Sequence, residues 1–320
     1  MAEKEKKTNP APDIRIGTLV KGNNESADYI RQILPHGFES FSLTFWGTNK
    51  EFDLARMADS VLGVLDGSDA IISSLAVFGN PLETESLDLE TVASWERAID
   101  MAHLFGCSTV GGFTGRLRGK PIHESLDRFR EIWSPLAERA EKNGVRIAFE
   151  NCDMGGTWDD GDWNIAHNPT AWQLMFDAVP SDALGLEWEP CHQMVSLIDP
   201  MPQIEEWGHK FYHVHGKDAT IRWDVVRKYG VHSSMHADVA LPGKVQLVPQ
   251  FAYHRTPGFG DSNWTDIISE LRRVGYAGSI DIEGWHDPVY RGELEMTGQV
   301  HGLNYLKRCR GGDFVANPVL

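Results

Sequence analysis

The 320-residue chain has few cysteines, no surplus of basic charge and no long apolar run. Its four cysteines, Cys107, Cys152, Cys191 and Cys309, form no C-x-x-C pair, which argues against a disulfide framework and a zinc ribbon. The 30 Lys and Arg against 46 Asp and Glu give a net charge of −16, which disfavours a nucleic-acid partner. No window approaches the ~18 uninterrupted apolar residues of a membrane span. We expect a cytoplasmic protein with reduced thiols that binds neither nucleic acid nor membranes.

Short apolar segments alternate with helical patterns along most of the chain. Eight of these segments have the composition of buried strands: 14–20, 38–46, 70–78, 107–113, 145–151, 183–189, 211–217 and 279–285. Eight strands alternating with helices predict a (β/α)₈ TIM barrel. The rival fold, a doubly wound sheet, normally carries a G-x-G-x-x-G loop after its first strand. Here the first strand runs into VKGNNES, which lacks that loop.

The chain is expected to form a single barrel domain over residues 14–320, preceded by a disordered tail over residues 1–13. The interval between the seventh and eighth strands is unusually long, so residues 219–261 are predicted to be an insertion. Long loops that follow barrel strands lie on the catalytic face, which makes this segment a candidate lid or partner-binding loop. Its polar residues include His232, His236, His254 and Arg255.

The last four predicted strands each end with an acidic or imidazole side chain, namely Glu150, Glu189, His215 and Glu283. The carboxyl ends of barrel strands meet at one mouth, so these side chains are expected to converge. Three converging carboxylates repel one another unless a positive charge lies between them. A site with several oxygen ligands and one nitrogen ligand suits one divalent cation. Mn²⁺ is the expected metal, and Mg²⁺ and Co²⁺ are alternatives.

Further candidates surround this predicted metal site. His192 follows Glu189 by three residues, and His213 shares the strand face of His215, where it is expected to point inward as a packed or supporting group. Candidate substrate contacts near the strand ends are Trp46, Asn80, Arg116, Lys217, Arg255 and Trp285.

Five motifs carry a resemblance to a known family: AFEN (148–151), LGLEWEPCH (184–192), HVHGKDA (213–219), PGFGDSNW (257–264) and SIDIEGWHD (279–287). The chain resembles the sugar phosphate isomerase/epimerase family of xylose-isomerase-like barrels, which includes ketose 3-epimerases. The resemblance implies a divalent metal on the four strand-end residues, proton exchange by Glu150 and Glu283, and a contact of His192 with a substrate oxygen. Two departures are Glu189, where the family usually has Asp, and the long insertion.

The expected activity is sugar isomerisation or epimerisation, in which a proton α to a carbonyl is removed and a metal stabilises the enolate. An alternative is a lyase on a 3-keto-glycoside, since the chain is also similar to catalytic subunits of C-glycoside deglycosidases, which work with a smaller subunit. In that case His192 or an insertion histidine acts as acid or base. The chain is expected to form either a homo-oligomer or a hetero-oligomer with a small second subunit. A non-catalytic sugar-binding subunit and an endonuclease-IV-like enzyme are further alternatives, and the acidic charge counts against the latter.

Overall fold

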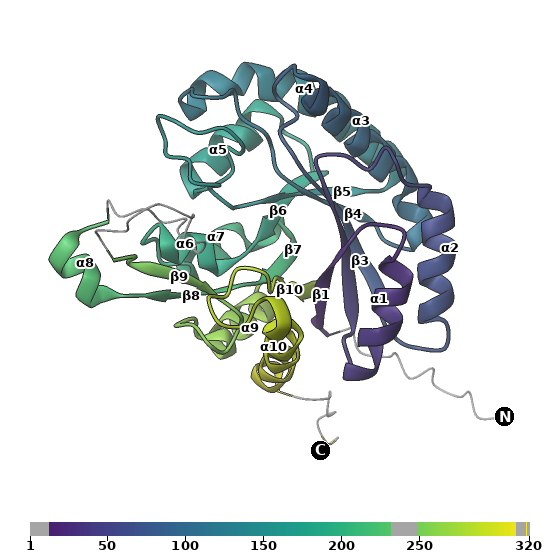
Figure 1. Ribbon diagram of the computed structural model, residues 1–320. Helices are drawn as coiled ribbons and strands as arrows, with labels where there is room; N and C mark the ends of the chain where they lie inside the picture. Colours follow the sequence, from purple (N-terminus) through teal and green to yellow (C-terminus); the bar gives the residue numbers. More distant parts are fainter. Residues whose placement is uncertain (1–12, 232–248, 312–317, 319–320) are drawn as a thin grey trace.

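The computed structural model describes residues 13–231, 249–311 and 318, and its centre is a closed barrel of eight parallel strands (Figure 1). Around the barrel the strands follow the order β1-β10-β7-β6-β5-β4-β3-β2. Their bounds are β1 Arg15–Lys21, β2 Ser40–Trp46, β3 Ile71–Phe78, β4 Thr109–Gly112, β5 Arg146–Glu150, β6 Leu184–Trp188, β7 Phe211–Gly216 and β10 Ser279–Ile282. Each lies within one of the eight predicted segments or extends it by a single residue, and the predicted TIM barrel is confirmed.

Helices surround the barrel on the outside (Figure 1). The α-helices are α1 Ser26–Ile33, α2 Leu54–Leu65, α3 Ser86–Met101, α4 Leu126–Asn143, α5 Pro169–Ala178, α6 Pro190–Val195, α7 Met201–Trp207, α8 Trp223–Tyr229, α9 Trp264–Arg273 and α10 Glu295–Arg310. Short 3₁₀ helices cover Leu34–His36, Ala102–Phe105, Ile122–Ser125, Gly208–Lys210 and Gly292–Leu294. Among the described residues, no helix is both long and apolar enough to cross a membrane.

Packing between helices and strands decides which side chains face the barrel interior. In β5, Phe149 packs edge-on against Trp133 of α4, with ring centroids 4.5 Å apart, and both side chains are fully buried. Side chains alternate along a strand, so the next residue, Glu150, points inward at the mouth of the barrel. The same alternation in β7 turns Val214 outward and His213 and His215 inward.

The described part of the predicted insertion forms a small unit beside the barrel (Figure 1). Strands β8 (Asp218–Ile221) and β9 (Ala252–Arg255) pair antiparallel, and α8 lies between them in sequence. The predicted tail, apart from Asp13, lies outside the described residues, as do His232 and His236. Asp13 forms an ion pair with Arg272 of α9.

Candidate active site

Glu150, His215 and Glu283 meet at the carboxyl-terminal mouth of the barrel. His215 Nδ1 lies 3.0 Å from Glu150 Oε1 and 3.5 Å from Glu283 Oε2. All three residues are buried, and they come from β5, β7 and the residue directly after β10. The structure therefore brings together three of the four side chains that the sequence places at this mouth.

The donor atoms of this group fit a divalent cation. Two carboxylate oxygens and one imidazole nitrogen lie within 4.8 Å of one another. Glu283 Oε2 is buried and accepts no hydrogen bond from the described residues. A buried carboxylate oxygen without a donor is costly, and a cation between the two carboxylates would remove that cost. We refer to Glu150, His215 and Glu283 as the metal group.

Lys217 brings a positive charge to the edge of the metal group. Its Nζ donates a hydrogen bond to Glu283 Oε1 at 2.7 Å and lies 3.1 Å from His192 Nε2. Burial opposes the charged form of Lys217, but Glu283 outweighs it and holds the pKa of Lys217 well above its usual 10.5. Burial likewise opposes the charged form of Glu283, but Lys217 and His215 hold its pKa well below the usual 4.5. The two side chains therefore form a charged pair at neutral pH.

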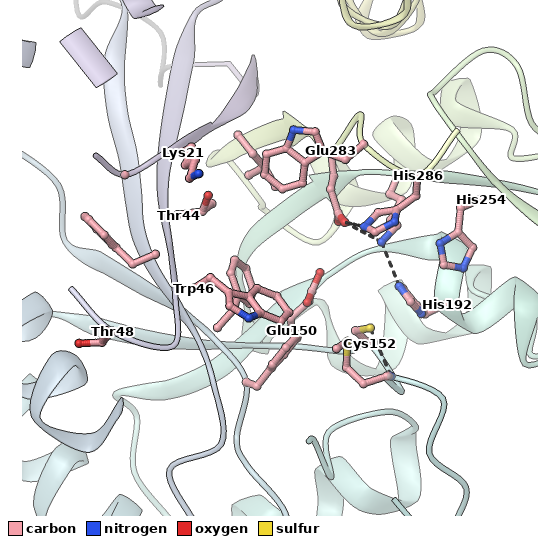
Figure 2. Close-up of a pocket in the computed structure, with 18 of the residues that line it drawn as sticks. Lys21, Thr44, Trp46, Thr48, Glu150, Cys152, His192, His254, Glu283 and His286 are labelled. Carbon is pink, nitrogen blue, oxygen red and sulfur yellow. Dashed lines mark hydrogen bonds and ion pairs between the residues drawn. The ribbon is translucent and has the colours of Figure 1, made fainter. Parts of the chain in front are cut away.

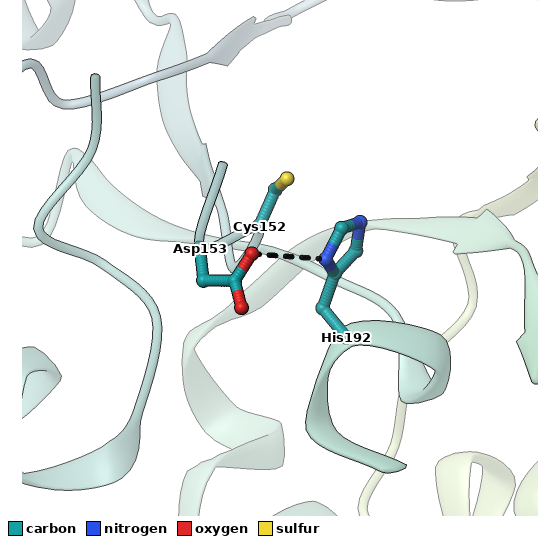
Figure 3. Close-up of side chains that lie close together, drawn as sticks. All are labelled: Cys152, Asp153 and His192. Atoms are coloured by element: carbon teal, nitrogen blue, oxygen red, sulfur yellow. Dashed lines mark ion pairs between the residues drawn. The ribbon is translucent and has the colours of Figure 1, made fainter. Parts of the chain in front are cut away.

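His192 is oriented through both of its ring nitrogens. Nδ1 lies 3.7 Å from Asp153 Oδ1 (Figure 3), while Nε2 faces Lys217. Cys152 lines the same cavity, and burial raises the pKa of its thiol to about 11. The sulfur is therefore protonated at neutral pH, which argues against a role as nucleophile.

Glu189 does not belong to the metal group. It is the N-cap of α6, and its carboxylate accepts the backbone N–H of His192 at 2.9 and 3.1 Å through its two oxygens. Helix α6 starts directly after Glu189, and an N-cap side chain satisfies amides that the first turn leaves unpaired. This capping contact fixes the backbone that carries His192, and the ligand role of Glu189 stays a prediction.

A cavity of about 900 Å³ opens above the metal group. Figure 2 shows Glu283, His286, His254 and His192 gathered on one side of it, facing Trp46 on the other. We call the first side the polar half. The second side, the aromatic half, comes from β1–β4 and the segments after them, and its apolar residues are Leu19, Phe45, Trp46, Phe52, Phe78 and Phe113.

Trp46, Lys217 and Trp285 line the cavity, as expected of substrate contacts. Asn80, Arg116 and Arg255 are not among the described residues that line it. The Asn80 amide group donates to the carbonyls of Arg116 and Asp162, and Arg255 is bound to Asp287 at 2.9 Å. These three side chains brace loops around the mouth, and their role as substrate contacts stays a prediction.

Arg116 provides a test of this structural role. Its buried guanidinium donates to the carbonyls of Lys120, Thr157 and Trp158 at 2.6–3.1 Å. Replacing Arg116 with Ala leaves these carbonyls without their donor and is expected to lower the free energy of unfolding by about 3 kcal/mol, measured by urea denaturation. The affinity for Mn²⁺ should stay within about twofold, because the metal group is untouched. A large loss of sugar affinity with unchanged stability would instead support the predicted role of Arg116 as a substrate contact.

His254 is the one insertion histidine within the described residues that lines the cavity. Its ring lies edge-on to that of His192, with centroids 4.8 Å apart. Burial and the nearby Lys217 ammonium hold its pKa well below the usual 6.5. His254 is therefore neutral at physiological pH and available as a hydrogen-bonding group.

Sequence reasoning missed two carboxylates beneath the metal group, Glu187 and Asp281. They precede Glu189 and Glu283 by two positions in LGLEWE and SIDIE. That spacing places Asp281 on the strand face that turns toward the interior, and this alternation was the available signal.

Comparisons with known proteins agree with this architecture. Residues 30–309 match the family described as xylose isomerase-like TIM barrel. The rhizopine catabolism protein MocC of Rhizobium meliloti is 28% identical over 192 residues, which cover 60% of this chain and 49% of MocC. The uncharacterized protein YfiH of Bacillus subtilis is 22% identical over 244 residues, covering 68% of this chain and 72% of YfiH. The chain thus spans about half the length of MocC.

Solved structures show the same fold at low sequence identity. The 3-keto-D-glucoside 4-epimerase YcjR from E. coli superposes with a TM-score of 0.66 at 14% identity, covering 93% of this chain and all (100%) of YcjR. An L-ribulose 3-epimerase gives 0.63 at 13% identity, covering 92% of each chain. The closed barrel and the match over residues 30–309 together show that the chain belongs to the xylose isomerase-like TIM-barrel family.

Proposed function

We propose that the protein is a divalent-metal-dependent sugar isomerase or epimerase that moves a proton α to a carbonyl group. The observation that carries this proposal is the metal group itself, in which two glutamates and one histidine enclose a site of cation size beneath an open cavity. The substrate class is supported by the names of the structural neighbours, which are epimerases of L-ribulose and of a 3-keto-glucoside. Mn²⁺ is the proposed metal, with Mg²⁺ or Co²⁺ as alternatives.

In this proposal, three side chains of the cavity, Glu283, Glu150 and His192, each have a separate chemical role. Glu283, kept ionised by Lys217, takes the proton from the carbon next to the carbonyl, and the C–H electron pair becomes the double bond of an enolate. A cation held by Glu150, His215 and Glu283 would supply positive charge for the enolate oxygen. For epimerisation, Glu150 delivers to the opposite face a proton that it has taken from solvent. For isomerisation, Glu283 gives its proton to the neighbouring carbon, and the hydroxyl proton moves to the former carbonyl oxygen. His192, beside Lys217, hydrogen-bonds the substrate oxygen.

The aromatic half of the cavity favours a second candidate, the cleavage of a 3-keto-glycoside. Trp46 is 64% exposed, and its ring lies 6.2 Å from that of Phe113 and 6.4 Å from that of Phe78. An exposed aromatic wall of this kind suits an apolar group attached to the sugar. In this reaction the enolate electrons expel a leaving group β to the carbonyl, and His192 gives that group its proton.

Proton exchange in D₂O tests both reactions. Metal-loaded protein is incubated with free ketoses and with an oxidised aryl glycoside, and the α-proton signal is followed by NMR. Loss of the signal with a free ketose supports the isomerase or epimerase, whereas exchange with release of the aryl group supports the lyase. Binding of these sugars without exchange would contradict both reactions and would favour the third hypothesis, a non-catalytic sugar-binding subunit.

That the protein works with a small second subunit and that it is cytoplasmic both remain predictions.

A further inference from the structure

A second cavity, of about 420 Å³, adjoins the cavity above the metal group. We call the smaller one the side cavity and the larger one the main cavity. Leu19, Lys21 and Trp285 line both, so the two cavities meet at these residues. The other residues that line the side cavity are Val20, Asn23, Glu25, Tyr29, Gly292, Glu295 and Met296. A ligand at the metal group therefore has a further direction in which to extend, past Trp285.

The lining of the side cavity is polar, in contrast to the aromatic half of the main cavity. Glu25 and Glu295 offer carboxylates, and Asn23 offers an amide. Lys21 adds an ammonium group. A sugar hydroxyl both donates and accepts hydrogen bonds, so it needs acceptors and donors together. One lysine against two glutamates gives these side chains a formal charge of 1 − 2 = −1, which disfavours a phosphate or carboxylate group. The side cavity thus suits an uncharged unit rich in hydroxyl groups.

Trp285 is held in place at the junction of the two cavities. Its indole N–H donates a hydrogen bond to the Glu295 carboxylate, which also accepts one from Gln299 Nε2 at 2.9 Å. Gln299 is 1% exposed, and its Oε1 accepts a hydrogen bond from the Thr18 hydroxyl of β1 at 2.6 Å. Trp285 follows Glu283 by two residues and is 40% exposed. An indole that is bound at its N–H and partly exposed offers an apolar surface to a sugar ring.

Two charged side chains of the side cavity are available to a ligand. Neither the Lys21 ammonium nor the Glu25 carboxylate has a hydrogen-bond or ion-pair partner among the described residues, and both residues are exposed. Glu25 directly precedes α1, but its side chain does not cap that helix. Lys21 lies across the main cavity from His192 and His254 (Figure 2). A ligand that reaches these groups gains charge-assisted hydrogen bonds, which are stronger than those between neutral groups.

We propose that the side cavity is a subsite for a second sugar residue, joined to the sugar whose carbonyl lies at the metal group, with Trp285 as the wall that both sugars contact. Lys21 and Glu25 bind hydroxyl groups of the second sugar. This inference rests on the proposed function, and it narrows the substrate class to a keto-sugar that is linked to a second, uncharged sugar residue.

The test compares the binding of D-fructose with that of ketose disaccharides that differ in linkage, namely lactulose, turanose and isomaltulose. Affinities are measured by calorimetric titration in the presence of Mn²⁺. The wild type should bind at least one disaccharide about 10-fold more tightly than fructose, which is what a hydrogen bond to a charged group contributes. Glu25→Ala removes such a group, and Met296→Trp fills the side cavity with a larger side chain. Each should lower the ratio of the two affinities by about 10-fold.

The control is Glu206→Ala, which removes an exposed glutamate of α7 that is not among the described residues lining either cavity. It should keep the wild-type ratio. Thermal unfolding checks that Met296→Trp is folded, and the exposed Glu25 provides the test on its own if that variant is not.

Two results would overturn the inference: no disaccharide that binds more tightly than fructose, or a ratio that Glu25→Ala and Met296→Trp both leave unchanged. Loss of binding of an aryl ketoside in Met296→Trp, with disaccharide binding intact, would overturn it in favour of an apolar occupant. The readout is binding without turnover. Absence of proton exchange with the expected ratios would therefore count only against the proposed function, and exchange without a disaccharide preference only against the subsite.

Discussion

Replacing Glu283 with Gln is expected to lower the rate of α-proton exchange by about 10²- to 10⁴-fold, the usual contribution of a general base. The amide cannot take the proton, and it also offers a cation a neutral oxygen in place of a charged one. Glu150→Gln should cause a loss of similar size and weaken Mn²⁺ binding as well, because Glu150 Oε1 lies 3.0 Å from His215 Nδ1 in the metal group. The measurements are deuterium exchange by NMR and a calorimetric Mn²⁺ titration.

Glu205→Gln is the matched control for these two variants, because Glu205 is an exposed glutamate on α7. It should keep both the exchange rate and the Mn²⁺ affinity of the wild type. Exchange at the wild-type rate in Glu283→Gln would remove Glu283 from the role of base. Mn²⁺ binding that survives unchanged in the Glu150→Gln/Glu283→Gln double variant would refute the ligand set.

Lys217→Met is expected to have the largest effect on stability. It leaves the carboxylate of Glu283 buried without its ammonium partner, which is expected to cost about 3–5 kcal/mol of unfolding free energy in the metal-free protein. Mn²⁺ should restore much of the loss, because a cation that binds only the folded state stabilises that state. Urea denaturation with EDTA and with Mn²⁺ measures both effects. Lys50→Met, which breaks an exposed pair with Glu90, should cost less than about 1 kcal/mol.

The pH dependence of stability follows from the same pair. The lowered pKa of Glu283 gives stability that is present above its usual 4.5 and is lost as the pH falls through the folded-state value. The raised pKa of Lys217 gives stability that is present below its usual 10.5 and is lost as the pH rises through the folded-state value. Lys217→Met removes the ammonium that lowers the pKa of Glu283, so the metal-free variant should lose less stability than the wild type between neutral pH and acid, and an equal loss would contradict the pairing.

The barrel and its open mouth could be predicted because they depend on local patterns. Strand segments recur with helices between them, and the carboxyl ends of parallel strands meet at one face of a barrel. Those two facts are enough to bring Glu150, His215 and Glu283 together. The predicted insertion after the seventh strand is also present, although residues 232–248 lie outside the described part of the chain.

The roles of Glu189 and Arg116 could not be read in the same way. Glu189 stands between β6 and α6, where a carboxylate can either reach a metal or cap the helix, and the outcome depends on backbone geometry. Arg116 binds carbonyls that lie up to 42 positions away. The carboxylates of Glu187 and Asp281 were missed for a different reason, since barrel interiors are expected to be apolar.

A crystal of the Mn²⁺-loaded protein, with anomalous diffraction at the manganese edge, tests the central claim most directly. The account predicts a single peak between Glu150, His215 and Glu283. A peak at the other buried cluster at this mouth, Cys152, Asp153 and His192, or no peak among the three metal-group residues, would contradict it.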